Sequence, residues 1–288
     1  MEELFKLESV KRTFLGFQPS FDDAGVVVIP VPYDSTTSYG VGTRFGPSAI
    51  IDASTQLELY DIELGKNISD DLPVYTLDEL VLDKGDPAKT MKIVEKAVSS
   101  VIKAGKKPVV LGGEHSITLG AVKAVKGFAD SDISVLHIDA HADLRDSYEG
   151  TKHSHASVMR RVREITKSTV QVGIRSMCDE EAEYIKKENP TIFYGKDFDV
   201  KKIVSQLKDK VYVTFDIDGF DPSVAPGTGT PEPGGLLWED VLEIMRALKG
   251  KQVLGFDVVE VLPTPPLKTT EFIAAKLAYK MMGYFWGQ

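Results

Sequence analysis

The chain alternates between short apolar runs and longer segments in which apolar residues recur every three or four positions. Short runs rich in β-branched residues are typical of buried strands, whereas the second pattern is typical of amphipathic helices. Strands are predicted at 25–32, 107–113, 133–138, 169–174, 191–194, 210–215 and 252–258. Helices are predicted at 47–54, 86–104, 117–126, 156–165, 179–188, 199–208, 238–248 and 268–285.

This alternation predicts a mainly parallel sheet covered by helices on both faces, which is a three-layer α/β/α fold. Residues 1–24 show no strong periodicity and are expected to wrap the surface. No linker-like tract, repeat or low-complexity block follows, so residues 1–288 are predicted to form a single domain. The Ser-, Thr- and Gly-rich segment 32–47 is expected to be a loop at the edge where α/β sheets bind ligands, or else a plain connector.

Composition and charge exclude several classes of protein. Hydrophobic residues make up 42% and charged residues 27% of the chain, as in globular proteins. No apolar run has transmembrane length, and acidic residues follow Met1 where a signal peptide would be basic, so we expect a cytoplasmic protein that binds no membrane. Cys178 is the single cysteine, which leaves no intrachain disulfide and no thiolate zinc site. The net charge of -9 argues against a nucleic-acid partner and permits a cationic ligand.

Metal-capable residues follow three of the predicted strands. The segments are Glu114-His115-Ser116, Asp139 to Asp143 (D-A-H-A-D) and Asp216 to Asp221 (D-I-D-G-F-D). Because the carboxyl ends of parallel strands lie along one edge of a sheet, these segments are expected to meet in one crevice. The predicted cluster contains four carboxylates and two imidazoles: His115, Asp139, His141, Asp143, Asp216 and Asp218.

Six such ligands are too many for one structural zinc ion, which takes four. Two divalent ions per subunit fit better, and they would remove the mutual repulsion of four carboxylates. Carboxylate and imidazole donors together favour Mn²⁺. A pair of such ions lowers the pKa of a bridging water and generates hydroxide near neutral pH, so the pattern predicts a hydrolase.

The remaining histidines and one glutamate have more than one interpretation. His137 lies inside a strand in phase with Asp139, and we expect a buried core histidine rather than a group that supports the ligands. His153 and His155 lie before a helix, where either is solvated, caps the helix or acts as a proton shuttle. Glu260 follows the last predicted strand and is suited to hold a planar guanidinium, with a surface glutamate as the alternative.

Six motifs resemble those of the ureohydrolase family, which includes arginases and agmatinases. They are G-G-E-H-S at 112–116, D-A-H-A-D at 139–143, S-H-A-S around His155, F-D-I-D-G-F-D-P at 215–222, G-T-G-T-P-E-P-G-G at 227–235 and D-V-V-E-V at 257–261. The resemblance extends from the loop near Gly40 to the last predicted helix, and the motifs occur in the family's order. Agmatinases are the most similar members.

The resemblance implies an arginase-like fold, a dinuclear manganese site and a homotrimer or homohexamer. Asp139 and Asp216 would bridge the two ions, and His155 and Glu260 would be the catalytic residues, as proton shuttle and guanidinium ligand. The implied ligands are His115, Asp139, Asp143 and Asp216 for one ion, and Asp139, His141, Asp216 and Asp218 for the other. The substrate would be a small cationic guanidinium compound, attacked by the bridging hydroxide to give urea and an amine.

Two departures from the arginase pattern decide the expected substrate. Arg145 replaces the asparagine found two residues beyond D-A-H-x-D in arginases, and Cys178 stands where the first acidic residue after G-x-R would align. Both departures weaken an arginase interpretation, and the form G-I-R-S from Gly173 resembles agmatinases. Agmatine, cleaved to putrescine and urea, is therefore the expected substrate, and arginine, guanidinobutyrate and aminopropylagmatine are the alternatives. Two other functions stay open: a one-zinc deacetylase on a related fold, and a metal-binding protein without catalysis.

Overall fold

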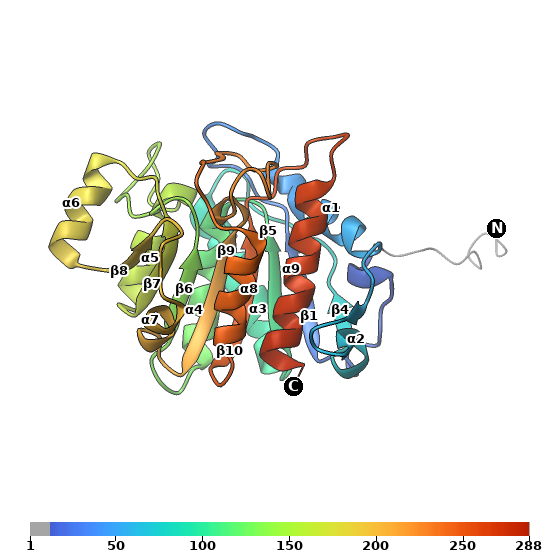
Figure 1. The fold of residues 1–288 in the computed structure, drawn as a ribbon. Helices are drawn as coiled ribbons and strands as arrows, with labels where there is room; N and C mark the ends of the chain where they lie inside the picture. The colour runs from blue at the N-terminus through green and yellow to red at the C-terminus, as the bar shows by residue number, and fades with distance from the viewer. Residues whose placement is uncertain (1–11, 288) are drawn as a thin grey trace.

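A computed structural model describes residues 12–287, and an eight-stranded sheet forms its centre (Figure 1). All strand pairs of this sheet are parallel, and the strand order is β4-β1-β5-β10-β9-β6-β7-β8. The strands are β1 (Val26–Val31), β4 (Val74–Thr76), β5 (Lys107–Gly112), β6 (Ser134–Ile138), β7 (Thr169–Ile174), β8 (Thr191–Tyr194), β9 (Lys210–Asp216) and β10 (Gln252–Val259). The predicted three-layer, mainly parallel fold is confirmed.

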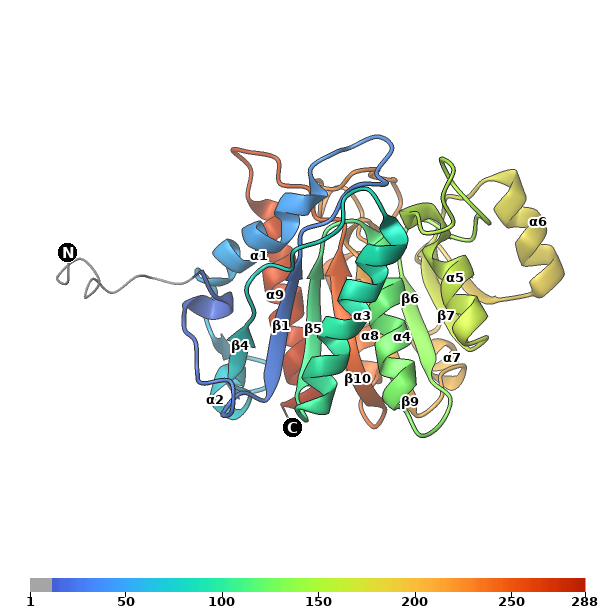
Figure 2. The same ribbon diagram turned by 180° about the vertical axis from the view of Figure 1, so that it is seen from behind.

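Helices cover both faces of the sheet (Figures 1 and 2). One face carries α3 (Pro87–Lys103), α4 (Thr118–Phe128) and α5 (Val158–Ile165), and the other carries α1 (Gly46–Ser54), α7 (Val200–Ser205), α8 (Trp238–Ala247) and α9 (Thr269–Trp286). The helix α6 (Asp179–Glu188) lies beyond the β8 edge. Each face has its own apolar core, because the side chains of a parallel strand point alternately to the two faces.

The helix α3 illustrates how the sequence specifies these elements. Asp86 caps its first turn by accepting a hydrogen bond from the Lys89 N–H, and Pro87 occupies the first helical position. Met91, Val94 and Val98 recur at helical spacing and are buried against the sheet. Burying each such side chain contributes about 1.5–3 kcal/mol relative to leaving it in water.

Several elements were not predicted from the sequence. They are the edge strand β4, the two-residue strands β2 (Tyr60–Asp61) and β3 (Lys66–Asn67), and the short helix α2 (Ile68–Asp71). The expectation that residues 1–24 wrap the surface is wrong for part of the described segment: Phe14 and Leu15 are buried, and the Phe14 N–H donates to Thr76 Oγ1 at 2.9 Å. Residues 1–11 lie outside the described part of the chain.

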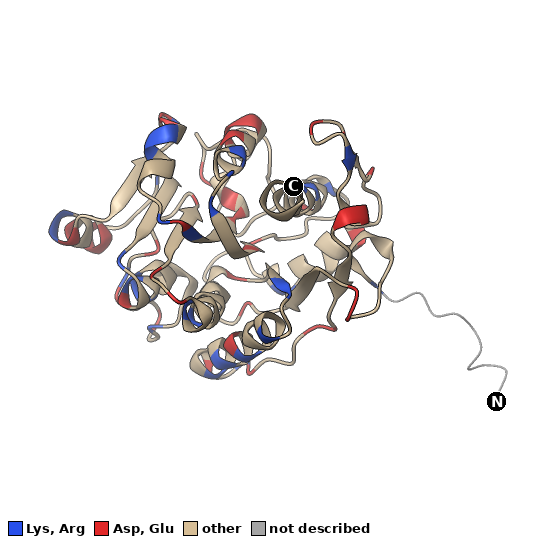
Figure 3. Ribbon diagram, turned by 90° about the horizontal axis from the view of Figure 1, so that it is seen from below, with Lys and Arg blue, Asp and Glu red and all other residues tan. Residues whose placement is uncertain are grey.

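Seen from below, the helices carry charged residues of both signs (Figure 3). In the view from below, Lys and Arg alternate with Asp and Glu along the helices (Figure 3). A nucleic-acid-binding surface is instead a continuous basic patch or stripe. No helix within residues 12–287 combines the length and the hydropathy needed to cross a membrane.

Candidate metal centre

The predicted site residues come together at the carboxyl ends of four adjacent strands. The strands β5, β10, β9 and β6 are consecutive in the sheet, although β9 and β10 enter it last along the chain. His115 follows β5, the segment Asp139 to Asp143 follows β6, and Glu260 follows β10. Asp216 is the last residue of β9, and Asp218 comes two positions later. The late insertion of β9 and β10 between β5 and β6 therefore assembles the site.

Tight backbone turns place several of these side chains. A Cβ atom on Gly113 would lie 1.9 Å from the Tyr33 carbonyl oxygen, so only glycine fits where the chain leaves β5. Asp143 and Glu260 adopt left-handed backbone conformations, with φ of 54° and 61°. Non-glycine residues in this region cost of order 1–3 kcal/mol and cluster at functional sites. The fold tolerates this strain at two of the predicted site residues.

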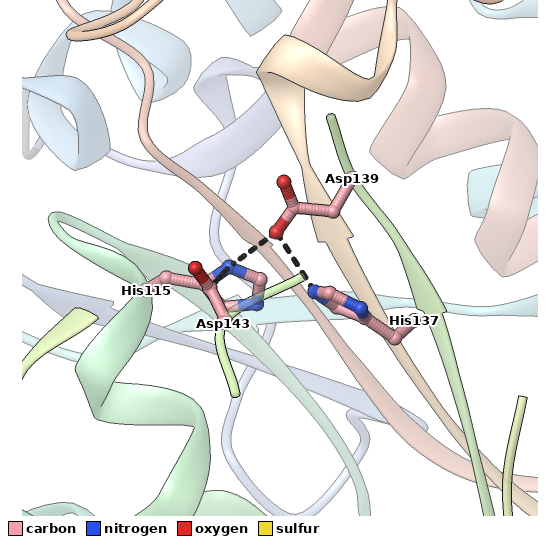
Figure 4. A group of neighbouring side chains, drawn as sticks. All are labelled: His115, His137, Asp139 and Asp143. Atoms are coloured by element: carbon pink, nitrogen blue, oxygen red, sulfur yellow. Dashed lines mark hydrogen bonds and ion pairs between the residues drawn. The ribbon is translucent and has the colours of Figure 1, made fainter. Parts of the chain in front are cut away.

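The first group of side chains surrounds His115. Its Nδ1 atom lies 3.1 Å from Asp139 Oδ2, 3.3 Å from Asp143 Oδ2 and 3.2 Å from Asp216 Oδ2. Figure 4 shows Asp139 and Asp143 directed toward the His115 ring. His115 and Asp139 are fully buried, and the other two carboxylates are nearly so. Three carboxylate oxygens and one imidazole nitrogen thus converge on a single point.

The second group surrounds His141 on the more exposed side of the site. His141 Nδ1 lies 2.9 Å from Asp218 Oδ2 and 3.6 Å from Asp139 Oδ1. Asp139 therefore belongs to both groups and directs one oxygen toward each histidine. This is the arrangement of a carboxylate shared between two neighbouring cation sites.

Backbone amides hold three of these carboxylates in fixed orientations. Asp139 Oδ1 accepts from the His141 N–H, Asp216 Oδ1 accepts from the Asp218 N–H at 2.9 Å, and Asp218 Oδ1 accepts from the Ala140 N–H at 3.0 Å. In Asp216 and Asp218 the Oδ2 atom is left to face a histidine. Such preorganisation is expected of ligands that bind an ion without rearranging.

A buried hydroxyl fixes the protonation of His115. Thr214 Oγ1 lies 2.6 Å from Asp257 Oδ1 and 2.8 Å from His115 Nε2. A hydroxyl has one proton, and Thr214 donates it to the Asp257 carboxylate, so it must accept from His115 Nε2–H. In the neutral ring the Nδ1 atom then keeps the lone pair that a cation would use. Burial lowers the pKa of His115, but the three neighbouring carboxylates more than offset it and raise the pKa well above its usual value, so a cation would displace a proton here. Within residues 12–287 this buried nitrogen has no hydrogen-bond partner, which fits a metal ligand and not a satisfied core histidine.

The ionisation of the cluster is strongly perturbed. Burial, followed by the negative charge of Asp139, raises the pKa of Asp143 to about 7. Burial, followed by the charges of Asp218 and Asp139, raises the pKa of Asp216 well above its usual range. Burial lowers the pKa of His141, but the Asp218 and Asp139 carboxylates more than offset it and bring the value to about 12. The carboxylates repel each other, and bound cations would remove that repulsion.

His137 combines the two roles that the sequence left open. It is fully buried, its Nδ1 accepts from Gln171 Nε2 at 2.9 Å, and its Nε2 donates to Asp139 Oδ2 at 2.8 Å. It is thus a satisfied core histidine, as expected, and also orients the carboxylate shared by the two groups (Figure 4).

Glu260 and His155 complete the wall of the cavity that leads to the cluster. Glu260 is 8% exposed, and its Oε1 accepts from the His115 N–H at 2.6 Å. His155 lies edge-on to the Tyr148 ring, with 5.7 Å between the ring centroids. The pKa of His155 is lowered to about 4, mainly because the imidazole is buried. The cavity has a volume of about 300 Å³, and its lining also includes Tyr39, Gly40, Arg145, Tyr148, Met177, Cys178 and Glu181.

Two other candidates lie outside the cluster. Asp221 binds its own loop: its carboxylate accepts from the N–H groups of Ser223, Gly234 and Gly235. His153 does not line the cavity, and its Nδ1 is buried without a hydrogen-bond partner in the described part of the chain. Of the two histidines before α5, His155 is therefore the one placed at the site. The roles of Thr214 and Asp257 were not predicted, because no spacing along the chain connects them to His115.

The eight-stranded parallel sheet, with two carboxylate–histidine groups at its carboxyl edge, points to a class of α/β metal-dependent hydrolases. The Arginase family profile matches residues 24–283, and the chain belongs to this family, which confirms the resemblance to ureohydrolases. It is 43% identical to the N(1)-aminopropylagmatine ureohydrolase of Synechocystis sp. over 93% of this chain and 91% of the relative. Identity to the enzyme of the same name from Thermococcus kodakarensis is 38%, over 98% of both chains. The agmatine ureohydrolase structure of Thermoplasma volcanium superposes with a TM-score of 0.89 and 33% identity, over 100% of this chain and 98% of that chain.

Proposed function

We propose that this protein hydrolyses the guanidinium group of an agmatine-type polyamine precursor, with water as co-substrate, and releases urea and a primary amine. The observation that carries the proposal is the pair of carboxylate–histidine groups around His115 and His141, which share Asp139 beside a cavity lined by Glu260 and His155. Membership in the arginase family supports the same reaction class.

The donor set fits two divalent cations. One would be held by His115, Asp139, Asp143 and Asp216, and the other by Asp139, His141, Asp216 and Asp218, with Asp139 and Asp216 shared. Oxygen and imidazole donors without thiolate favour Mn²⁺ among the first-row metals. When bound, two such ions supply a water molecule that is ionised near neutral pH and can attack the guanidinium carbon.

Glu260 is the group proposed to orient the substrate. The His115 N–H fixes one of its oxygens, and the left-handed backbone holds the side chain at the cavity wall. Burial, followed by the charge of Glu114, raises its pKa, so an incoming guanidinium would compensate a carboxylate that is costly to ionise alone. The planar cation would donate to this carboxylate and present its central carbon to the water.

His155 is proposed to deliver the proton that the leaving amine requires. Cleavage of the bond between the guanidinium carbon and the alkyl-substituted nitrogen leaves an amine that must gain a proton, while urea forms on the other side. The Nε2 atom of His155 has no hydrogen-bond partner within the described residues, and the side chain lines the cavity. An imidazole at this place can move a proton between water and the departing nitrogen.

The tail of the substrate distinguishes the candidates. The names of the Synechocystis and Thermococcus relatives favour N(1)-aminopropylagmatine, whose tail carries two cationic nitrogens. Agmatine, the substrate expected from the sequence, is the second candidate and is favoured by the name of the Thermoplasma structure. Arg145 and Cys178 line the cavity, at the positions where arginases were expected to carry an asparagine and an acidic residue. Arginine is therefore the least favoured substrate.

The experiment is a comparison of kcat/KM for urea release from N(1)-aminopropylagmatine, agmatine, arginine and guanidinobutyrate in the presence of Mn²⁺. The highest value is expected for one of the first two compounds. An Asp216→Asn variant, purified in parallel, controls for contaminating ureohydrolase of the expression host. A higher efficiency on arginine or guanidinobutyrate would overturn the substrate class, and absence of urea from all four would overturn the activity.

The family also suggests the state of the protein in the cell. We propose a single-domain subunit that assembles into a homotrimer or homohexamer in the cytoplasm. Size-exclusion chromatography with light scattering tests the assembly: a mass of three or six times 31.6 kDa is expected, and a monomer would contradict it.

A further inference from the structure

Glu114 is a buried carboxylate for which the proposed reaction has no direct use. It has no exposed surface, and three donors converge on it: Thr36 Oγ1 at 2.5 Å and Ser116 Oγ at 2.5 Å on Oε1, and the Thr36 N–H at 2.7 Å on Oε2. Burying a carboxylate is costly unless such hydrogen bonds compensate it. Thr36 donates two of these three hydrogen bonds. Glu114 therefore anchors the long loop after β1 at Thr36.

Thr36 connects this carboxylate to His155. Its Oγ1 lies 3.3 Å from the His155 backbone nitrogen and 3.5 Å from His155 Nδ1. A hydroxyl has one proton and two lone pairs, and the short bond to Glu114 uses the proton. The two contacts from His155 therefore use the lone pairs of the Thr36 hydroxyl. In both contacts His155 is the hydrogen-bond donor. This polarity places a proton on Nδ1 of the imidazole and leaves Nε2 unprotonated.

The same device operates elsewhere in the structure. Asp257, Thr214 and His115 form a chain of carboxylate, threonine hydroxyl and imidazole, in which the threonine donates to the carboxylate and accepts from the ring. There the proton is held on Nε2, and Nδ1 faces the cluster of carboxylates. In the hydrogen-bonded series Glu114–Thr36–His155, Thr36 contacts Nδ1 of the ring instead. The nitrogen of His155 that keeps its lone pair is therefore Nε2. In each case the hydrogen-bonded threonine determines which ring nitrogen keeps its lone pair.

We propose that Glu114 and Thr36 are positioning residues that hold neutral His155 as the Nδ1–H tautomer, with the Nε2 lone pair available in the cavity. The tautomer itself is independent of the reaction. Only its catalytic consequence rests on the proposed function: a shuttle that must accept a proton at Nε2 before passing it to the leaving amine works only if that atom is unprotonated. The Tyr148 ring packs nearly perpendicular to the imidazole, and this contact limits rotation of the imidazole.

The test is ¹⁵N nuclear magnetic resonance of the full chain with labelled histidine, at a pH above the titration of His155. Spectra are recorded for the metal-free protein and for the protein loaded with diamagnetic Zn²⁺, and His155 is assigned by its loss in His155→Asn. We expect a protonated Nδ1 and an unprotonated Nε2 in both states. A wild-type His155 protonated at Nε2 would overturn the proposal, whatever the variants do.

Variants distinguish an effect of the Glu114–Thr36–His155 hydrogen bonds, the relay, from an effect of side-chain packing. Thr36→Val removes the hydroxyl at constant shape, and we expect it to abolish the Nδ1–H preference, whereas Thr36→Ser keeps the hydroxyl and should restore it. Glu114→Gln offers an amide N–H to Thr36, which would free the threonine proton for Nδ1 and shift the tautomer to Nε2–H. Ser116→Ala is the matched control: it removes a donor to the same Glu114 oxygen without contact to His155 and should leave the tautomer unchanged.

Urea release adds the catalytic consequence. Thr36→Val should lower kcat by at least roughly 10-fold with little change in KM, and Thr36→Ser should recover most of it. Unchanged tautomers in Thr36→Val and Glu114→Gln would overturn the relay even if kcat falls. A wild-type chain with the expected tautomer but no urea release would overturn the proposed function and leave the relay intact, so the two failures are distinguishable.

Discussion

Replacing Thr214 with valine removes the hydroxyl that links His115 to Asp257 while keeping the shape of the side chain. Two polar groups lose their partner. Asp257 Oδ1 loses its 2.6 Å hydrogen bond, and His115 Nε2–H loses its 2.8 Å acceptor. Asp257 and His115 are 0% and 1% exposed, so water does not replace either bond. A hydrogen bond to a charged group is worth about 1.5–3 kcal/mol and an unpaired buried donor costs about 1–3 kcal/mol, so the metal-free protein should lose about 2.5–6 kcal/mol of unfolding free energy.

The same substitution should weaken cation binding. Without Thr214, nothing holds the proton of His115 on Nε2, and the tautomer with a protonated Nδ1 cannot bind a cation through that atom. Loss of the partner that orients a metal ligand typically costs 10–100-fold in affinity, and we expect a decrease within about this range. Isothermal titration with Mn²⁺ measures the affinity, and denaturant unfolding of the metal-free protein measures the stability.

Thr118→Val is the matched control. Thr118 Oγ1 donates to Asp257 Oδ2 at 2.9 Å, and this oxygen keeps the Tyr212 hydroxyl at 2.8 Å. The control variant should lose stability but bind Mn²⁺ as the wild type does, because His115 keeps its acceptor. Equal Mn²⁺ affinities for Thr214→Val and the wild type, or an equal weakening by both valine variants, would refute the reasoning about His115.

Three further outcomes follow from the site. His155→Asn should lower kcat for urea release by about 10²–10⁴-fold with unchanged metal content by elemental analysis, and a large loss of metal would show that His155 is a ligand instead. Glu260→Gln keeps an acceptor for the His115 N–H but loses the charge, so KM should rise about 10–100-fold in steady-state kinetics, and an unchanged KM would exclude a guanidinium at this carboxylate. Burial and the charge of Asp139 raise the pKa of Asp143 to about 7, so Mn²⁺ must displace a proton, and calorimetry should show affinity rising as the pH passes through about 7. The raised pKa also stabilises the metal-free protein at acidic pH, a contribution lost as the pH rises through about 7, so chelation should lower the melting temperature more above this pH than below it.

The sequence predicted where the six expected metal ligands lie, because each one follows a predicted parallel strand. The segment D-A-H-A-D follows a predicted strand, and the rule that parallel strands end at a common edge joined Asp139, His141 and Asp143 to His115 and Asp216. The structure brings these residues together, with nitrogen–oxygen distances from 2.9 to 3.6 Å. Periodicity also predicted α3, because its apolar residues recur at helical spacing along one face.

The supporting hydrogen bonds could not be predicted in the same way. Thr214 meets His115 only because β9 and β10 insert between β5 and β6, and Thr36 reaches Glu114 across 78 positions of the chain. A threonine has no periodic signature that distinguishes a relay from a surface hydroxyl. Phe14 was missed for a related reason: an isolated aromatic residue in an irregular segment shows its burial only when β4 supplies the partner at Thr76.

The most direct test of the account is a titration of the metal-free protein with Mn²⁺, followed by urea release from N(1)-aminopropylagmatine and from agmatine. Two groups of ligands that share Asp139 predict that urea release rises with added Mn²⁺ and reaches its maximum at two ions per chain. A maximum at one ion per chain, or full urea release from the metal-free protein, would contradict the proposed dinuclear site.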